Sequence, residues 1–414
     1  MTNAETAAAR YRWVALLVAF LSQFANALAS QGIAPLAPLF QPELGLTNAQ
    51  VGFFSSAAYA GAWGVLLVAG TLTDRHGVRR MLSIGQLLIG GFMLSMAAVG
   101  SYVQAIAVMF GAGVGRGVTS PGISKAIMDW FPSRSRATAM GVKQTGVPAA
   151  GILAASTLPA IALVFGWRSA VAMVGVFVVV AALVTSLLYR DYRQADVPAQ
   201  GKSGMRAGLR QVIRIKQIWL MSAVSVLYVT VQLGLTTYLA LYFKEVILVS
   251  QVPDASTRVV AAGGFLALCQ GGGVFGRVFW GLVSDRLFHG RRMVVMAIIG
   301  GLSACCSLFM ARLDPGIPLW LLSGTVFFFG ATAIGWNGLY QAVMAESAGR
   351  RYAATGVGFG MTLAQAGTVG GPPLFGFVVD VTGSFQTAWT MLGGLSVAGT
   401  AIALYCARQE MVVE

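Results

Sequence analysis

The sequence predicts an all-α membrane protein with twelve transmembrane helices in two pseudo-symmetric six-helix halves. Three observations support this fold class. The 414 residues are 57% hydrophobic and 10% charged, with a mean hydropathy of +0.74, whereas soluble domains carry about 25% charged residues. The apolar stretches reach the roughly 20 residues that a helix needs to cross a bilayer. A polar loop motif occurs twice, separated by about half the chain.

The apolar stretches give the expected spanning helices. They are 13–36, 48–72, 81–100, 103–128, 137–162, 169–189, 217–243, 259–283, 293–312, 317–343, 353–379 and 386–407. The first is too long for the apolar core of a signal peptide, so we expect no cleaved leader. The four cysteines fall within these spans without metal-ligand spacing and are expected to be packing residues.

The positive charges predict the orientation of the chain in the membrane. If both termini are cytoplasmic, 20 of the 28 Lys and Arg residues lie on the cytoplasmic side, four lie outside and four lie within spans. Short loops rich in Lys and Arg stay in the cytoplasm. We therefore expect a multi-pass protein of a bacterial inner (plasma) membrane with both termini inside. Because the charges occupy these short loops, the net charge of +14 does not indicate nucleic-acid binding.

The longest polar stretch divides the chain into two halves. Residues 190–216 are basic and contain Pro198 and Gly201, and we expect a cytoplasmic linker with an amphipathic helix around 205–215. The expected domains are an N-terminal half, 1–189, and a C-terminal half, 217–414. The halves repeat each other, because the loop at 70–80 returns at 281–292 and the segment 136–142 returns at 351–357.

The repeated loop carries the most specific resemblance to a known family. Residues 70–80 read Gly-x-Leu-x-Asp-Arg-x-Gly-x-Arg-Arg, which resembles the signature loop of the major facilitator superfamily. The second copy and the parallel repeat of six spans extend the resemblance to the whole chain. It implies a transporter with its substrate site near the membrane midplane between the halves.

The resemblance also implies that the two loops form a cytoplasmic gate, in which Asp74 accepts hydrogen bonds from a helix N-terminus and pairs with Arg. The alternative is a charge cluster that only sets topology. The expected gating residues are Asp74, Arg75, Arg79, Arg80, Asp285, Arg286 and Arg291.

Shorter motifs point to subfamilies. The segment 130–141, Trp-Phe-Pro followed by Arg136 and Gly141, resembles the organic anion:cation symporters. Residues 277–285, Arg-x-x-x-Gly-x-x-x-Asp, are similar to the eighth span of monocarboxylate carriers. The fifth-span Gly-Pro of drug:proton antiporters is replaced by Gly-Val-Pro at 146–148, so the chain departs from that exporter pattern.

Arg116 is the leading candidate for a substrate-binding residue. It lies near the middle of 103–128, where an unpaired charge costs at least about 2.5–3.5 kcal/mol. Lys143 and Arg277 raise the same question in 137–162 and 259–283. No Asp, Glu or His lies deep in any expected span, so the missing partner is expected to be an anion, and a guanidinium suits bidentate carboxylate or phosphate binding.

Each of these cations also has a structural interpretation. Arg116 can cap backbone carbonyls where Pro121 bends its helix, and Arg277 can pair with Asp285 or with carbonyls. Lys143 can extend to the membrane interface, and we expect Lys125, closer to the inner face, to do so.

Neutral polar and aromatic side chains near the midplane fit a small organic ligand, although each alone can equally hold helices together. The candidates are Gln23, Asn26, Tyr228, Gln232, Gln270, Asn337, Tyr340 and Gln365.

These patterns favour a secondary transporter of a small organic anion, a carboxylate before other anions, with proton-coupled uptake. The proton would travel on the substrate or on Lys143, because no acid or His lies at membrane depth; anion exchange would need no such group. The rival hypotheses are a proton-antiporting exporter of drugs or metabolites, which a buried acid would favour, and a non-transporting sensor.

The expected partners are the substrate anion, a co-transported proton and the lipid bilayer, with the chain acting as a monomer. We expect no enzymatic activity, cofactor or metal site, because no Ser/His/Asp, Cys/His or metal-ligand set converges in the sequence.

Overall fold

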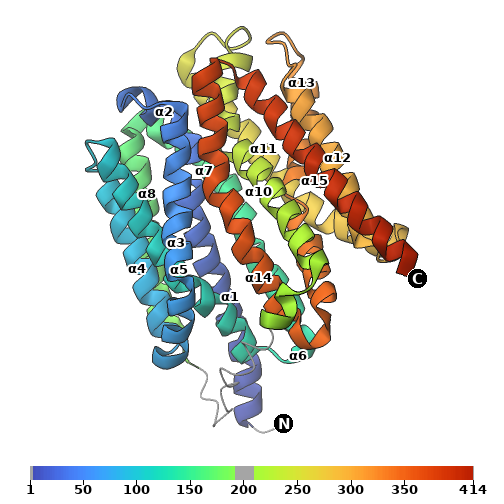
Figure 1. Ribbon diagram of the computed structural model, residues 1–414. Helices are drawn as coiled ribbons and strands as arrows, with labels where there is room; N and C mark the ends of the chain where they lie inside the picture. The colour runs from blue at the N-terminus through green and yellow to red at the C-terminus, as the bar shows by residue number, and fades with distance from the viewer. Residues whose placement is uncertain (1–2, 192–208, 414) are drawn as a thin grey trace. The chain divides into compact units, whose positions relative to one another are not determined.

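The computed structural model describes residues 3–191 and 209–413, and these residues are helical except for short connections (Figure 1). Most of the expected linker lies outside the described residues, as do residues 205–208 of its expected helix around 205–215, whereas 209–213 are helical. By internal contacts the chain divides into two units. The first contains residues up to 46 and 53–195, and the second contains 47–52 and 196–414.

The first unit is built from helices joined by short connections. They are α1 (Asn3–Gln31), η1 (Ala34–Leu36), α2 (Ala37–Glu43), most of α3 (Asn48–His76), α4 (Val78–Met96), α5 (Tyr102–Trp130), α6 (Ser133–Gln144), α7 (Gly146–Phe165) and α8 (Trp167–Leu188).

Glycines allow the helices of the first unit to pack closely. A Cβ on Gly113 of α5 would lie 2.1 Å from the carbonyl oxygen of Ala58 on α3, and one on Gly61 of α3 would lie 2.2 Å from that of Phe110. A Cβ on Gly85 of α4 would meet Thr119 of α5 at 2.5 Å. Small residues that admit a neighbouring backbone are typical of membrane helix interfaces. They hold α5, which carries Arg116, against both α3 and α4.

The second unit has a corresponding series of helices. They are α10 (Lys216–Tyr242), the π-helical turn η2 (Phe243–Ile247), α11 (Ala255–Leu282), the π-helical turn η3 (Val283–Leu287), α12 (Arg292–Met310), α13 (Leu319–Ala333), α14 (Asn337–Thr382) and α15 (Phe385–Val413).

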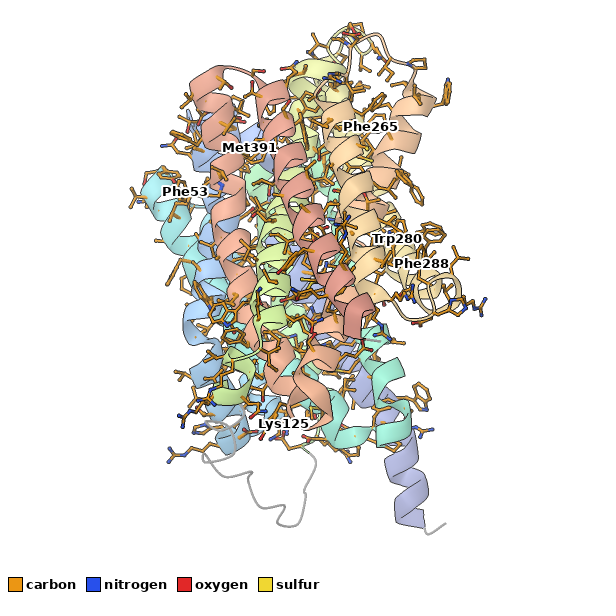
Figure 2. The ribbon with its side chains drawn as sticks, turned by 45° about the vertical axis from the view of Figure 1, so that its right-hand side comes forward. Phe53, Lys125, Phe265, Trp280, Phe288 and Met391 are labelled. Carbon is orange, nitrogen blue, oxygen red and sulfur yellow. The ribbon has the colours of Figure 1, made fainter. Side chains whose placement is uncertain are left out.

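Glycine contacts also define the α11–α13 pair of the second unit. A Cβ on Gly272 or Gly276 of α11 would lie 2.0 Å from a carbonyl oxygen of α13, and Trp280 Nε1 donates to the carbonyl of Ala331 at 2.9 Å. Figure 2 labels Trp280 near the end of α11 and Phe288 just beyond it. These contacts fix the face of α11 on which Arg277 lies.

Sequence features account for the helix ends. Ser101 caps α5 by accepting from the backbone N–H of Gln104, and Asp254 caps α11 by accepting from that of Thr257. Gly77, with φ of 87°, precedes α4, and Gly383, with φ of 65°, ends α14. Asp380 accepts from the backbone N–H groups of Asn48 and Ala49 in the second unit and thus caps the start of α3.

The all-α fold class is confirmed, but two expected spans are not continuous helices. Span 137–162 is divided between α6 and α7 at Thr145, shortly before Pro148, which has no N–H to continue the helix. Span 317–343 is divided between α13 and the start of α14. Within α14, Gly349 has φ of 74° and separates this part from the expected span 353–379.

By length and composition, eight segments of the described chain are long and apolar enough to cross a membrane, or nine if the bent α3 is counted, and the eight include 139–165 and 319–349, each of which covers most of one of the divided spans. The remaining expected spans, 81–100, 103–128 and 353–379, coincide with α4, α5 and the second part of α14.

Candidate functional site

Arg116 on α5 contacts an aromatic ring from α3 rather than a carboxylate. Its guanidinium carbon lies 4.5 Å from the ring centroid of Tyr59, a cation–π distance. Its Nη1 is buried and makes no hydrogen bond within the described part of the chain. Its own carbonyl accepts from the hydroxyls of Thr119 and Ser120, at 2.9 and 2.8 Å. The side chain is therefore held by Tyr59 and leaves a donor available.

Asn26 of α1 joins this group through Thr119. Its Nδ2 donates to Thr119 Oγ1 at 2.6 Å, and the Asn26 side chain is only 4% exposed. Asn26 and Arg116 line one cavity of about 10 Å³ together with Ser30 and apolar residues of α1, α3, α4 and α5. The structure thus brings together two of the expected ligands, Arg116 and Asn26.

Lys143, near the end of α6, contacts α5 at Ser124, about two helical turns beyond Arg116. Its side chain is 7% exposed, and its Nζ donates to Ser124 Oγ at 3.2 Å. Arg116, Ser120 and Ser124 follow each other at i, i+4 and i+8, so they share one face of α5. Eight residues correspond to about 12 Å along a helix. Lys143 therefore approaches the face that carries Arg116, but at a different depth.

Arg277 on α11 is the corresponding cation of the second unit. Its Nε is buried without a hydrogen bond among the described residues. The ion pairs of the described chain include neither Arg277 nor Arg116 nor Lys143. The pairing of Arg277 with Asp285, which the sequence left open, is not formed, because Asp285 lies 3.7 Å from Arg292 instead.

Two other expected ligands of the second unit contact each other. Asn337 Nδ2 donates to Gln232 Oε1 at 3.1 Å and to the carbonyl of Ile334 at 3.2 Å. Asn337 begins α14 directly after the break that separates it from α13, and Gln232 lies on α10. This pair presents amide groups at the end of a helix, where backbone groups are also available.

The aromatic candidates pack as a cluster around Trp336. The Tyr228 and Trp336 ring centroids are 5.7 Å apart, and those of Trp336 and Tyr340 are 5.5 Å apart. Tyr228 also donates to the carbonyl of Met296 at 3.0 Å, so its hydroxyl holds α10 to α12. Tyr228 and Trp336 line a second cavity of about 10 Å³ in this unit.

The other neutral candidates lie on α1, α11 and α14. Gln23 lies on α1 three residues before Asn26 and beside the start of α7, since its Cβ is 3.6 Å from where a Cβ on Gly146 would be. Gln270 is buried on α11, seven residues before Arg277, and Gln365 is partly buried on α14.

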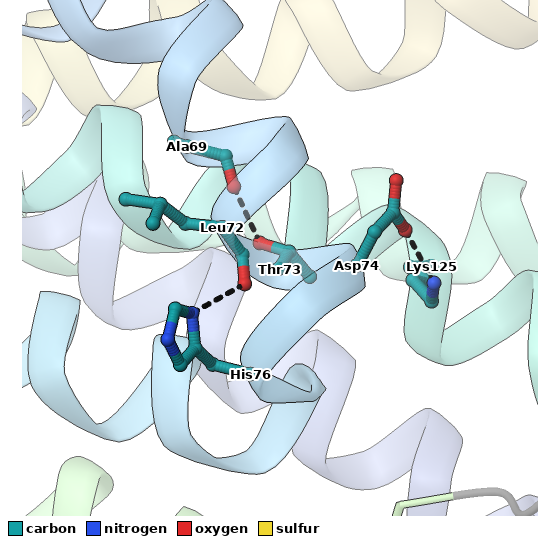
Figure 3. Close-up of polar contacts among 6 residues, drawn as sticks. All are labelled: Ala69, Leu72, Thr73, Asp74, His76 and Lys125. Carbon is teal, nitrogen blue, oxygen red and sulfur yellow. Dashed lines mark hydrogen bonds and ion pairs between the residues drawn. The ribbon is translucent and has the colours of Figure 1, made fainter.

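The gating candidate Asp74 pairs with Lys125, as Figure 3 shows. Among the described residues Asp74 pairs with Lys125 rather than with the Arg that we expected, and the expectation that Lys125 extends to the inner face stays a prediction. Lys125 lies nine residues after Arg116 on α5, and its side chain is 35% exposed. The carboxylate is therefore held within the first unit.

The arginines of this loop make different contacts. Arg79 donates through its Nε to the carbonyl of Ser186 and through its backbone N–H to Asp191. Arg75 and Arg80 are exposed. Asp191 thus takes the role of an N-terminal cap for α4, and Arg79 joins α4 to α8.

The second copy of the loop is centred on Arg292. Its Nη1 lies 2.9 Å from Glu346 Oε1 and its Nη2 lies 3.7 Å from Asp285 Oδ1. These residues lie on α12, α14 and η3, and the two carboxylates are largely exposed. Arg286 is exposed, and Arg291 directly precedes α12. Glu346 was missed by sequence reasoning, although an acid just beyond an expected span is a recognisable pattern.

Tyr59 and Ser124 were missed as well. Ser124 was recognisable by its i+8 spacing from Arg116, whereas nothing in the sequence relates Tyr59 to Arg116. Among the described residues no group of three His, Cys, Asp or Glu side chains is placed to hold a metal ion.

Comparison with known proteins identifies the family. The family model of the Major Facilitator Superfamily matches residues 19–372. The chain belongs to this superfamily. Its members are transporters rather than enzymes, so the expected class of protein is confirmed and the chain is a multi-pass membrane protein.

Several facilitator proteins are similar over nearly the whole chain. The hexuronate transporter of Bacillus subtilis (strain 168) is 23% identical over 92% of this chain and 91% of its own length. A protein of Escherichia coli (strain K12) named "Probable L-galactonate transporter" is 26% identical over 99% of this chain and 92% of its own. The crystal structure of the nucleoside transporter NupG has a TM-score of 0.76 at 15% identity, covering 96% of this chain and 98% of that one, which shows the shared fold.

Proposed function

We propose that this protein is a secondary transporter that moves a small organic anion, with a carboxylate as its charged group, by alternating access. The observation that carries the proposal is the set of three cations on spanning helices, Arg116, Lys143 and Arg277, none of which has a carboxylate within 4 Å in the described chain. A buried charge is normally paired or neutralised. A substrate anion supplies the missing partner.

Two features support a carboxylate substrate. A guanidinium offers parallel N–H donors that match the two oxygens of a carboxylate, as they match those of a phosphate, and Arg116 Nη1 makes no hydrogen bond among the described residues. Hexuronate and L-galactonate, for which two of the similar transporters are named, each combine a carboxylate with several hydroxyls. The Gln232–Asn337 amides and the buried Asn26 and Gln270 are suited to such hydroxyls.

We assign separate roles to the two cations of the first unit. Arg116 binds the carboxylate, with Tyr59 fixing the guanidinium plane. Lys143 contacts Ser124, which lies about 12 Å from Arg116 along α5. It attracts the anion at another depth and is our candidate for carrying a co-transported proton. Arg277, the corresponding cation of the second unit, is likewise proposed as a ligand of the substrate anion.

The loop clusters are proposed as the gate. Asp74 with Arg75, Arg79 and Arg80, and Asp285 with Arg286 and Arg291, control access at the side that the distribution of Lys and Arg assigns to the cytoplasm. Both termini then lie in the cytoplasm, the membrane is a bacterial inner membrane, and the monomer with its two six-helix halves is the working unit.

A thermal-shift screen of the purified protein tests this proposal. The panel contains glucuronate, galactonate, glucose, glucose 6-phosphate and a lipophilic cationic drug. A ligand at 100 times its Kd raises the free energy of unfolding by about 2.7 kcal/mol. We expect stabilisation by a carboxylate and its loss in Arg116→Ala. Stabilisation by the cationic drug alone, unchanged in that variant, would favour the exporter hypothesis.

A further inference from the structure

A carboxylate from α14 holds the first turn of α3. Asp380 Oδ1 accepts hydrogen bonds from the backbone N–H and from Nδ2 of Asn48, both at 2.9 Å. Asp380 Oδ2 accepts from the backbone N–H of Ala49 at 2.8 Å. Hydrogen bonds to a charged acceptor are among the stronger ones, and the positive end of the helix dipole adds to them. Asp380 therefore binds this helix end as a fixed anion.

The helix α3 does not depend on Asp380 to begin. Thr47 and Gln50 form a capping box, in which Thr47 Oγ1 accepts from the backbone N–H of Gln50 at 3.2 Å and Gln50 Oε1 accepts from that of Thr47 at 2.9 Å. The two N–H groups that Asp380 binds lie at an exposed helix end, where water is an alternative acceptor. The contact with Asp380 is thus an attachment to another helix and not a condition for forming α3.

Tyr238 of α10 and two glycines pack around the same turn. The Tyr238 hydroxyl donates to the carbonyl of Asn48. A Cβ on Gly376 of α14 would lie 2.3 Å from the carbonyl oxygen of Asn48, and one on Gly52 of α3 would lie 2.6 Å from that of Pro372. The backbones of α3 and α14 are therefore in direct contact at this turn.

The helix α3 is shared between the two units of the chain. Its first turn, within 47–52, groups with the second unit, whereas the helix continues from residue 53 as part of the first unit. The first-unit part carries Tyr59, whose ring contacts the Arg116 guanidinium. Tyr59 lies 11 residues after Asn48, about 16 Å along the helix. One helix thus joins the turn that Asp380 holds to the ring that holds Arg116.

The attachment lies at the end of α3 away from the proposed cytoplasmic gate. Asn48 begins α3, whereas the loop at 70–80 with Asp74 lies at its other end. Asp380 follows the expected span 353–379. In the proposed orientation the second span begins outside and the eleventh ends outside, so the distribution of Lys and Arg assigns Asn48 and Asp380 to the same, outer side.

We propose that Asp380, Tyr238 and the first turn of α3 form an outer latch, which releases in each transport cycle. The inference rests on the proposed function through its alternating access, in which one half of a transporter rocks against the other. The helix cannot follow the first half with Tyr59 and Arg116 while its first turn stays bound to the second. The three hydrogen bonds of Asp380 are therefore exchanged for water when the outer side opens.

A covalent clamp gives the first test. Asn48→Cys and Asp380→Cys are combined in a Cys305→Ser background, since Cys305 is the exposed native cysteine, and the two thiols are joined by a short bifunctional thiosulfonate. We expect galactonate uptake into proteoliposomes to fall to the level of protein-free liposomes and to recover after reduction. Undiminished uptake by the joined protein would overturn the latch.

The ion pair of Glu43 and Arg168 provides the matched control. Both residues belong to the first unit, and the pair is exposed. Glu43→Cys joined to Arg168→Cys by the same reagent should retain uptake, because the two positions move together. If both joined proteins stop transporting, the block does not come from the latch and the inference is overturned.

Asp380→Ala gives the second test. Losing a carboxylate that caps a helix shifts an equilibrium by about 2- to 30-fold. The concentration of external galactonate that half-saturates uptake should fall by up to this factor, because a larger fraction of the protein is open to the outside. Asp254→Ala removes a cap that acts within the second unit, and it should lower the melting temperature without changing half-saturation. The same behaviour in Asp380→Ala would mean that Asp380 is only a structural cap.

The outcomes separate the latch from the substrate on which the proposed function depends. If the wild-type protein takes up another solute and no carboxylate, the proposed substrate class fails, and the clamp is then tested with that solute. If the double-cysteine protein does not fold, the comparison of Asp380→Ala with Asp254→Ala decides.

Discussion

Arg116→Ala should weaken carboxylate binding by about 10- to 150-fold without a matching loss of stability in the ligand-free protein. Hydrogen bonds to a charged group contribute about 1.5–3 kcal/mol, which corresponds to that range of affinity. The stability of the free protein depends on different terms. Losing the contact with Tyr59 costs about 0.5–2 kcal/mol, but the buried Nη1, which has no partner in the described chain, no longer has to be accommodated. The two terms oppose each other.

Arg116→Lys separates geometry from charge. The ammonium keeps the positive charge but cannot form two parallel hydrogen bonds with one carboxylate, so we expect affinity to recover by less than about tenfold. Affinity is measured by isothermal titration with galactonate, and stability by the melting temperature of the free protein in the same detergent. A structural arginine would give the opposite pattern, in which Arg116→Ala lowers the melting temperature by several degrees and leaves affinity unchanged.

Three further predictions address other parts of the chain. Lys125→Ala removes the partner of Asp74 and leaves this carboxylate available to the proposed gate. Because the exposed pair contributes about 0.2–1 kcal/mol, the transport rate should change by up to about fivefold while substrate binding is unaffected. An unchanged transport rate would argue against a role for the pair. Lys143→Gln should retain substrate exchange in proteoliposomes but lose accumulation driven by a pH gradient, and undiminished accumulation would mean that the proton travels elsewhere. Hydrogen bonds from Ser256 and Thr257 hold the pKa of Asp254 well below its ordinary value, so the charged cap stabilises the fold above about pH 4 and this stabilisation is lost in stronger acid. The melting temperature of Asp254→Asn should therefore fall less than that of the wild type between about pH 5 and 3. Equal decreases in the two proteins would contradict the assignment.

The fold class could be predicted from the sequence because the features that indicate it lie within single segments of the chain and occur several times. Apolar length, charge placement and a duplicated loop each report on a whole span or a whole half. Breaks within spans were harder to predict. Gly349 is one of 52 glycines, and nothing in the sequence distinguishes Thr145 from other threonines in the spans. Pro148 was visible, but membrane helices tolerate proline, so it did not by itself predict a break.

The charged residues of the candidate site were named from the sequence, but the side chains that they contact were not. Arg116 is conspicuous because no acid lies near it in the sequence, whereas its contact with Tyr59 joins residues of α5 and α3 that are far apart in the chain. The Asp74–Lys125 pair bridges 51 positions, and it was not predicted because sequence spacing along one helix does not show which side chains a neighbouring helix places beside it. Side-chain partners across helices depend on packing, which a single sequence does not report.

Uptake of radiolabelled galactonate and glucuronate into proteoliposomes tests the central claim most directly. The wild-type protein should show saturable uptake of at least one of these carboxylates, competed by the other and not by glucose, and Arg116→Ala should reduce it to the level of protein-free liposomes. Saturable transport of a neutral or cationic solute with no carboxylate uptake, or full carboxylate uptake by Arg116→Ala, would contradict the account.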